Sequence, residues 1–179
     1  LLQAIMGIGP RVQGFVGYQN RSISGLPSYQ RARLGLGFVA EDRRLFTALS
    51  VRENLLVAAR APQAHARGWA ALSVARRLEQ VLTLFPALST MLERSAAQMS
   101  GGEQQMLGLA RTLMTGPTLL LLDEPCEGIA PMLVASIRDA VLELKREGMS
   151  LLVAEQNGIL AARADRVITL KAQTPLHAD

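Results

Sequence analysis

The pattern of apolar and polar residues divides the chain into segments with two kinds of regularity. In some segments apolar residues recur every three or four positions, which is the spacing of one face of an α-helix. In others they form a short continuous run, which is typical of a strand covered on both faces. The pattern predicts helices at 1–8, 27–33, 51–60, 69–85, 101–115 and 131–147, a loop at 62–68, and strands at 14–18, 36–40, 118–122, 150–154 and 166–170.

Polar residues at the segment ends support these boundaries. Ser50 and Glu53 have the spacing of a capping box, in which each side chain binds the backbone N–H of the other residue. Ser100 and Glu103 repeat the same spacing. The two boxes therefore mark the starts of helices just after Ser50 and Ser100.

The order of these elements predicts an α/β fold with a parallel sheet. Strands 118–122, 150–154 and 166–170 are separated by helices, and such units form right-handed crossovers between parallel strands. The stretch 50–98 contains only predicted helices. We therefore expect an α/β core made of 1–49 and 99–179, with a helical subdomain at 50–98 inserted into it.

Two adjacent carboxylates follow the apolar run that ends at Leu122. Ligands of a parallel sheet gather beyond the carboxyl ends of its strands, where Asp123 and Glu124 are expected. Neighbouring side chains of a strand point to opposite sides, so one carboxylate can hold Mg²⁺ while the other orients a water that attacks a phosphoryl group. The alternative is an acidic pair that only solvates the corner before Pro125.

A second candidate site is the start of the helix that follows Ser100. Gly101 and Gly102 leave the backbone N–H groups of this helix end open to an anion, which the helix dipole also favours. The alternative is an ordinary helix cap, because the capping box explains Ser100 and Glu103 without any ligand.

Taken together and in order, these segments resemble the ATP-binding cassette (ABC) ATPases. Residues 99–105 (MSGGEQQ) are similar to the signature motif of that family, and residues 119–125 (LLLLDEP) to its Walker B motif. Further similarities are to the Q-loop at 37–46, the D-loop at 126–131 and the switch segment at 153–157. The resemblance runs from residue 1 to about residue 170. Its closest form is the ATP-binding subunit of bacterial branched-chain amino acid importers.

The resemblance implies ATP and Mg²⁺ bound between two ATP-binding subunits arranged head to tail. Asp123 is then implied to hold Mg²⁺ and Glu124 to act on the attacking water as the catalytic residue. Glu41 is implied to sense the metal through water and to link to transmembrane permease subunits, with a solute-binding protein as an indirect partner. The nucleotide-binding residues implied by the resemblance are Glu41, Ser100, Gly101, Gly102, Gln104 and Gln156.

Several positions depart from the pattern of the family. Glu41 stands where most members have Gln, and Gln156 stands where most have His. An amide cannot accept a proton at neutral pH, so proton acceptance falls on Glu124 alone. Cys126 replaces the usual D-loop serine and is expected to be a small buried thiol. Residues 171–179 do not follow the closing strand and turn of the family.

The motif G-x-x-x-x-G-K-[ST], whose N–H groups and Lys cradle phosphates, occurs nowhere in the 179 residues. The family places it just before the segment that matches Leu1–Ile8, and places the strand leading into it beside the strand that matches 118–122. The resemblance therefore implies an N-terminally truncated cassette, either a fragmentary gene model or a degraded copy. We expect the chain alone neither to bind nor to hydrolyse ATP usefully.

Other functions stay open beside the importer ATPase. One is a non-catalytic module that lends the Ser100–Gly102 face to ATP held by a partner. Another is the ATPase subunit of a urea or amide importer. A third is a cassette ATPase that acts on nucleic acid or ribosomes, but those carry tandem cassettes or long coiled-coil insertions, and this sequence has neither.

Composition narrows the class of protein further. Apolar residues make up 49% and charged residues 19% of the chain, which excludes a disordered charged tail. The apolar runs are too short to span a membrane, and one cysteine excludes a disulfide framework. Residues 1–100 hold 12 arginines and 5 acidic residues, but the arginines are scattered along predicted helices. We therefore expect most arginines on solvated faces and no nucleic-acid partner. The resemblance implies a chain attached to the cytoplasmic side of the inner membrane through permease subunits.

Overall fold

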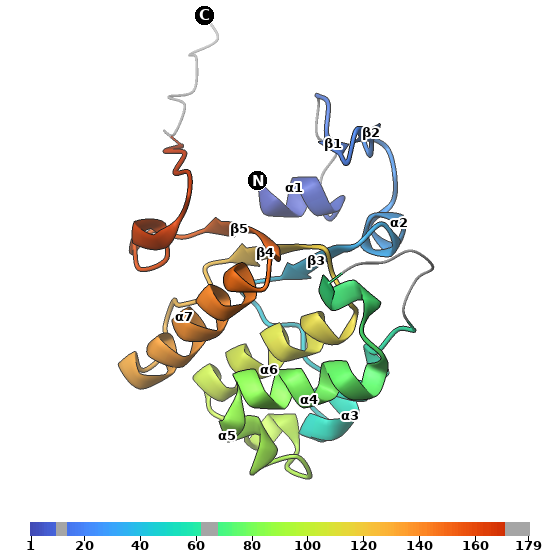
Figure 1. The fold of residues 1–179 in the computed structure, drawn as a ribbon. Helices are drawn as coiled ribbons and strands as arrows, with labels where there is room; N and C mark the ends of the chain where they lie inside the picture. The colour runs from blue at the N-terminus through green and yellow to red at the C-terminus, as the bar shows by residue number, and fades with distance from the viewer. Residues whose placement is uncertain (10–13, 62–67, 171–179) are drawn as a thin grey trace, which may run out of the picture.

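A three-stranded parallel sheet lies at the centre of the computed structural model, which describes residues 1–9, 14–61 and 68–170 (Figure 1). Its strands lie side by side in the order β3 (Leu36–Val39), β4 (Leu119–Asp123) and β5 (Ser150–Ala154). Val39 pairs with Leu122, which pairs in turn with Val153, so all three strands end at one edge of the sheet. The predicted parallel α/β fold is confirmed.

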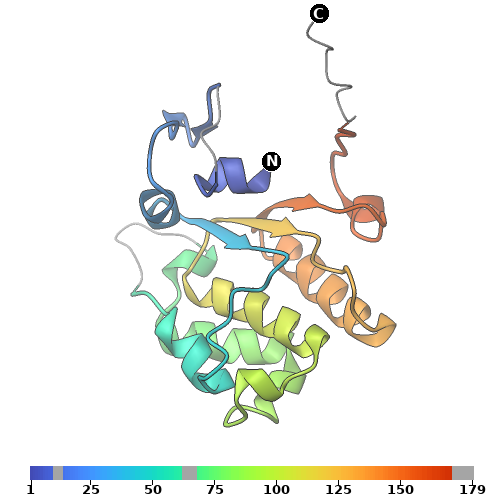
Figure 2. The same ribbon diagram turned by 180° about the vertical axis from the view of Figure 1, so that it is seen from behind.

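Helices cover both faces of this sheet (Figures 1 and 2). One face carries α1 (Leu2–Met6), with α2 (Ser28–Arg33) and the antiparallel pair β1 (Gly17–Tyr18) and β2 (Arg21–Ser22) beside it. The other face carries α6 (Gly101–Met114) and α7 (Pro131–Arg146). Beyond α6 lie α3 (Val51–Val57), α4 (Val74–Leu84) and α5 (Pro86–Ser89), together with the 3₁₀ turns η1 (Gly68–Ala71) and η2 (Ala96–Gln98); η3 (Ala161–Arg163) follows β5.

Two apolar clusters hold these layers together. Leu120 and Leu122 of β4 pack into the larger cluster, between the sheet and α3 to α7. Leu121 faces the opposite way, into a smaller cluster beneath α1. All three side chains are fully buried, which confirms that the continuous apolar run forms a strand covered on both faces.

Two predicted helices have different boundaries in the structure. The helix predicted over 51–60 ends at Val57. The segment 69–85 contains η1 and then α4, because the hydroxyl of Ser73 accepts a hydrogen bond from the backbone N–H of Arg76 and starts a new helix there. Both predicted capping boxes are confirmed. Most of the predicted loop at 62–68 and all of 171–179 lie outside the described residues.

The prediction of a strand at 166–170 is wrong. This segment pairs with no other strand in the described part of the chain, and its side chains Val167, Ile168 and Leu170 are exposed. The expected place for an upstream strand is also wrong. β4 pairs with β3 on one side and β5 on the other, so neither of its edges is free for another strand. Within the described residues, the outer edge of β5 is unpaired instead.

The two ends of residues 50–98 are joined to each other. Ser50 and Ser95 form an antiparallel bridge, and the backbone N–H of Val51 donates to the carbonyl of Arg94. The helices of this stretch also share the larger apolar cluster with α6 and α7. The boundaries of an inserted subdomain at 50 and 98 stay a prediction.

Two arginines are exceptions to the expectation of solvated faces. Arg31 and Arg77 are 6% and 1% exposed, respectively. Nε of Arg31 donates to the carbonyl of Leu26 at 2.8 Å, and Nη1 of Arg77 donates to the carbonyl of Met114 at 2.7 Å, at the end of α6. Both side chains act as buried donors to backbone carbonyls, so they add no basic surface.

Candidate functional site

The carboxyl ends of β4 and β5 bring two of the predicted site residues into contact. The side chain of Gln156 donates from Nε2 to Oε1 of Glu124 at 3.2 Å, and the backbone N–H of Gln156 lies 3.3 Å from Oε2. The backbone N–H of Glu124 donates to the carbonyl of Ala154 at 2.9 Å. One residue therefore orients both oxygens of the Glu124 carboxylate.

The backbone at Glu124 supports a special role for this position. Its φ angle is 46°, in the left-handed region that residues with a side chain rarely adopt. Such a conformation persists only where the surrounding structure imposes it, and it recurs at functional sites. Here the bonds from Glu124 to Ala154 and Gln156 impose it.

Asp123 and Glu41 lie at the same edge of the sheet. Asp123 ends β4 half-buried, and Glu41 follows β3 in an exposed position. Within residues 1–9, 14–61 and 68–170, neither side chain makes a hydrogen bond or ion pair. No group of three or more His, Cys, Asp or Glu side chains in this part of the chain could hold a metal ion. Mg²⁺ commonly takes one or two carboxylates and completes its shell with substrate phosphates and water, so Asp123 fits as a single protein ligand.

The start of α6 is an ordinary capping box and also a tightly packed helix end. Glu103 Oε2 accepts from the backbone N–H of Ser100 at 2.7 Å, and this bond contributes most to lowering the pKa of the Glu103 carboxyl. A Cβ atom on Gly102 would lie 2.2 Å from Cδ1 of Leu133 on α7. The glycine at 102 is therefore required by the packing of α6 against α7, whatever its role toward a ligand.

Arg43 lies across this helix end. A Cβ atom on Gly101 would lie 3.3 Å from Nη2 of Arg43, and Nε of Arg43 donates to Oε1 of Gln105 at 3.2 Å. Gln104 is also engaged within the chain, because its Nε2 donates to the carbonyl of Ala96 at 3.0 Å. The face predicted to meet phosphate thus carries a guanidinium that sequence reasoning missed.

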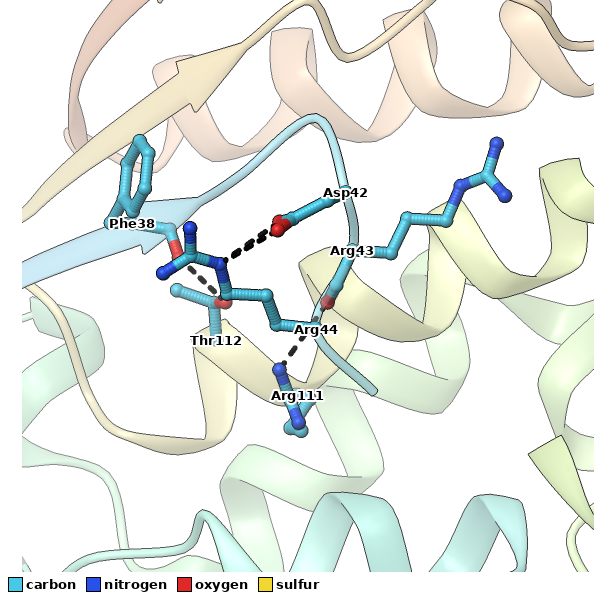
Figure 3. Close-up of polar contacts among 6 residues, drawn as sticks. All are labelled: Phe38, Asp42, Arg43, Arg44, Arg111 and Thr112. Atoms are coloured by element: carbon cyan, nitrogen blue, oxygen red, sulfur yellow. Dashed lines mark hydrogen bonds and ion pairs between the residues drawn. The ribbon is translucent and has the colours of Figure 1, made fainter. Parts of the chain in front are cut away.

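The turn after β3 is fixed to α6 by side chains (Figure 3). Arg43 and Arg44 both have positive φ angles, 60° and 47°. The side chain of Arg44 turns back to Asp42 and forms an ion pair at 2.9 Å, while the side chain of Arg43 points away from it. Nη2 of Arg111 lies 3.4 Å from the carbonyl of Arg43. These contacts hold the segment that resembles the Q-loop in one conformation.

Cys126 follows the two carboxylates and is buried, as expected. Burial, with a smaller contribution from the charge of Glu155, raises the pKa of its thiol to about 11. The thiol is therefore protonated at neutral pH and is not a candidate nucleophile.

The structure thus places Glu41, Asp123, Glu124 and Gln156 at one edge of the sheet. The strand pattern predicted this place for Asp123 and Glu124, and the resemblance implied the other two as site residues. Ser100, Gly101 and Gly102 start a separate helix, and in the described part of the chain no hydrogen bond joins them to Glu124 or Gln156. Sequence reasoning missed Arg43 and Glu155. The signal for Glu155 was its position at a strand end directly before Gln156. No local pattern marks Arg43.

This arrangement suits chemistry on a phosphoryl group. Glu124 is a half-buried carboxylate with both oxygens oriented, which is the requirement for a group that accepts a proton from an attacking water or positions it. Asp123 adds a second carboxylate on the neighbouring position of the same strand end. Gln156 supplies neutral donors that hold Glu124 without competing for the proton.

Comparisons with known proteins show which proteins this chain resembles. The branched-chain amino acid transport ATP-binding protein BraG of Pseudomonas aeruginosa is 37% identical over 96% of this chain and 71% of BraG. The probable branched-chain amino acid transport ATP-binding protein LivF of Archaeoglobus fulgidus is 32% identical over 88% of this chain and 64% of LivF. The lipopolysaccharide export system ATP-binding protein LptB of Acidithiobacillus ferridurans is 30% identical over 81% of this chain and 58% of LptB.

A solved nucleotide-free ATP-binding cassette from an ABC transporter superposes with a TM-score of 0.73 and 25% identity, over 92% of this chain and 68% of that one. The chain thus spans 58 to 71% of the length of the three relatives. Residues 1–127 match the family model described as ABC transporter. This chain belongs to the ABC transporter family.

Proposed function

We propose that this chain is part of the ATP-hydrolysing subunit of an importer for branched-chain amino acids. The observation that carries the proposal is the Glu124 carboxylate, held at the end of β4 by both N–H groups of Gln156. Relatives named for branched-chain amino acid transport support the choice of solute. A relative named for lipopolysaccharide export, LptB, also matches, and the ATPase reaction proposed here does not depend on which solute is carried.

In this proposal Glu124 accepts the proton of the water that attacks the γ-phosphate of ATP. Asp123 would hold Mg²⁺, which supplies charge neutralisation on the phosphates when bound. Gln156 fixes the Glu124 carboxylate and presents its amide toward the phosphate. Glu41 lies at the same edge, where it would contact the metal through water.

The start of α6 would contact a different ATP molecule from the one that Glu124 acts on. Ser100, Gly101, Gly102 and Gln104 make no hydrogen bond to Glu124 within the described residues, which fits a role toward ATP bound by a second ATP-binding subunit. A head-to-tail dimer would then place this helix end against the phosphates of the partner. The positive end of the α6 dipole and the Arg43 guanidinium both favour an anion there.

Permease subunits are the proposed membrane partners, with a solute-binding protein as an indirect one. No helix in the described part of the chain is long and apolar enough to cross a membrane. A groove of about 510 Å³ lies beside the turn after β3, and its lining includes Arg43, Arg44, Arg60 and Arg111. We assign this groove to the permease contact, on the cytoplasmic side of the inner membrane, because it adjoins the Glu41 turn.

The test uses the completed protein, meaning this chain joined to an upstream segment that carries the glycine-rich loop. Glu124→Gln keeps the shape of the side chain but removes the proton acceptor. We expect nucleotide binding to stay within a few-fold of the unchanged protein and single-turnover hydrolysis to fall by roughly 10²–10⁴, as is typical when a positioned base is removed.

Gln156→Ala is the matched variant for that test. It removes the side-chain amide that donates to Glu124 and leaves the carboxylate in place, so its loss of rate should be smaller than that of Glu124→Gln. Full activity in Glu124→Gln, or a larger loss in Gln156→Ala, would show that Glu124 is not the base.

A further inference from the structure

Glu155 closes the loop that carries Gln156. Its Oε1 accepts hydrogen bonds from the backbone N–H groups of Leu160 and Ala161, at 2.7 and 2.9 Å. Leu160 is buried in the larger apolar cluster, so the carboxylate ties the end of β5 to a fixed point of the core. Its second oxygen, Oε2, is buried and has no hydrogen-bond partner in the described part of the chain.

The loop between these points has its own turn chemistry. Asn157 Oδ1 accepts from the backbone N–H of Ile159 at 3.1 Å, and Gly158 has a φ of 72°. Gln156 is exposed in this loop. The position of Gln156 therefore depends on the hydrogen bonds that Glu155 and Asn157 make within the loop.

The side chains of the neighbouring residues Glu155 and Gln156 bind different partners. The side chain of Gln156 reaches Glu124, while that of Glu155 turns to the N–H groups of its own loop. A carboxylate is well suited to bind the N–H groups of the loop, because one charged oxygen can accept two short hydrogen bonds. Such bonds are stronger than those to a neutral acceptor. The bonds to Leu160 and Ala161 have this short geometry.

We propose that Glu155 is a positioning residue that acts through Gln156 to orient the Glu124 carboxylate. This inference rests on the proposed function of Glu124. No hydrogen bond joins the side chain of Glu155 to Glu124 in the described part of the chain. The effect of Glu155 on catalysis would come from keeping the 155–161 loop closed, so that both N–H groups of Gln156 stay opposite the two oxygens of Glu124.

The first test is a double-mutant cycle in the completed protein. Glu155→Ala should lower single-turnover hydrolysis by roughly ten- to a hundredfold, the scale expected when a reacting group is slightly misplaced, with nucleotide affinity changed less than threefold. In a Gln156→Ala background the same substitution should lower the rate by a smaller factor than in the unchanged protein, because the side-chain bond to Oε1 is already gone and only the backbone N–H bond to Oε2 remains. Glu155→Gln retains the Oε1 acceptor and should recover most of the rate.

The second test measures amide hydrogen exchange in the same completed protein, and it needs no activity. Glu155→Ala should speed exchange at Leu160, Ala161 and Gln156, while Glu147→Ala, which removes an exposed carboxylate at the end of α7, should leave these amides unchanged. A multiplicative rate loss in the double mutant, or unchanged exchange at Gln156, would overturn the proposal. If the unchanged protein shows no hydrolysis, the proposed function fails, and the exchange result still decides the role of Glu155 in the loop.

Discussion

Asn54 is a fully buried polar residue, and its side chain binds the turn that leads into α3. Its Oδ1 accepts from the backbone N–H of Phe46 at 3.1 Å. Its Nδ2 lies 2.9 Å from the carbonyl of Phe46 and 3.0 Å from that of Ser50. The turn from 46 to 50 is thus held by one amide, and this turn continues from the Glu41 segment of the site.

We expect Asn54→Ala to lower the free energy of unfolding by about 2–4 kcal/mol. The substitution leaves the backbone N–H of Phe46 without its partner, which costs roughly 1–3 kcal/mol, and it removes the bonds that Nδ2 donates, each worth about 0.5–1.5 kcal/mol. Urea unfolding measures the change. Gln98→Ala is the control, since Gln98 is exposed, and it should change stability by about 0.5 kcal/mol or less. Equal stability of the two variants would contradict the role given to Asn54.

At this scale the sequence predicts some contacts and not others. The capping boxes at Ser50 and Ser100 could be predicted because both partners lie within one helical turn. The bonds of Asn54 and Glu155 join groups whose relative positions depend on irregular turns. No periodicity encodes such turns. Asn54 and Glu155 were therefore missed, although Glu124 and Gln156 were predicted as site residues.

At the scale of helices, Gly102 of α6 packs directly against Leu133 of α7. A Cβ atom there would lie 2.2 Å from Leu133 Cδ1 and 3.3 Å from Leu133 Cβ. The first contact can be relieved only if the Leu133 side chain or the whole helix moves. Gly108 lies on the same helix, and the nearest atom to a Cβ at that position is 3.6 Å away, which is an ordinary contact.

Gly102→Ala should therefore destabilise the protein by about 1–3 kcal/mol, the usual cost of overpacking. Gly108→Ala should be neutral or stabilising by up to about 1 kcal/mol, because alanine favours a helix interior more than glycine does. In a Leu133→Ala background, Gly102→Ala should lower the free energy of unfolding by less than it does in the unchanged protein, because the side chain that the new Cβ meets has been shortened. The measurement is the urea unfolding midpoint of the three single variants and of the double variant. Equal effects of the substitutions at Gly102 and Gly108 would exclude a packing role for Gly102.

The strands show what an apolar pattern can and cannot predict. Residues 118–122 and 150–154 were predicted as buried strands, and both lie in the sheet. Only the first is buried as predicted, at Leu120 to Leu122, whereas Leu152 of β5 is exposed. Residues 166–170 have a similar pattern but no partner strand in the described part of the chain. A strand needs a neighbour to satisfy its N–H and C=O groups, and its own sequence does not contain that neighbour.

At the scale of the whole molecule, the parallel sheet brings residues that are distant in the sequence to one edge. Glu41, Asp123 and Gln156 follow three different strands, which the pairing register brings to the same end. This gathering could be predicted, since it follows from parallel topology alone. The pairing order could not be predicted from the strand patterns. β4 lies in the middle of the sheet and pairs with a strand on each side. An upstream strand therefore cannot lie beside β4, although the resemblance had implied that place.

The last prediction concerns the affinity of the 179 residues for nucleotide. The described residues supply the strand-end carboxylates and the start of α6, while the sequence holds no glycine-rich phosphate loop with its lysine. Without about three charge-assisted phosphate contacts, each contributing roughly 1.5–3 kcal/mol, affinity should fall by about three to six decades. Isothermal titration of the 179-residue chain with Mg-ATP should then show no binding tighter than about millimolar, whereas the completed protein should bind. A micromolar dissociation constant for the chain alone would show that Asp123, Gln156 and their neighbours are sufficient to hold the phosphates.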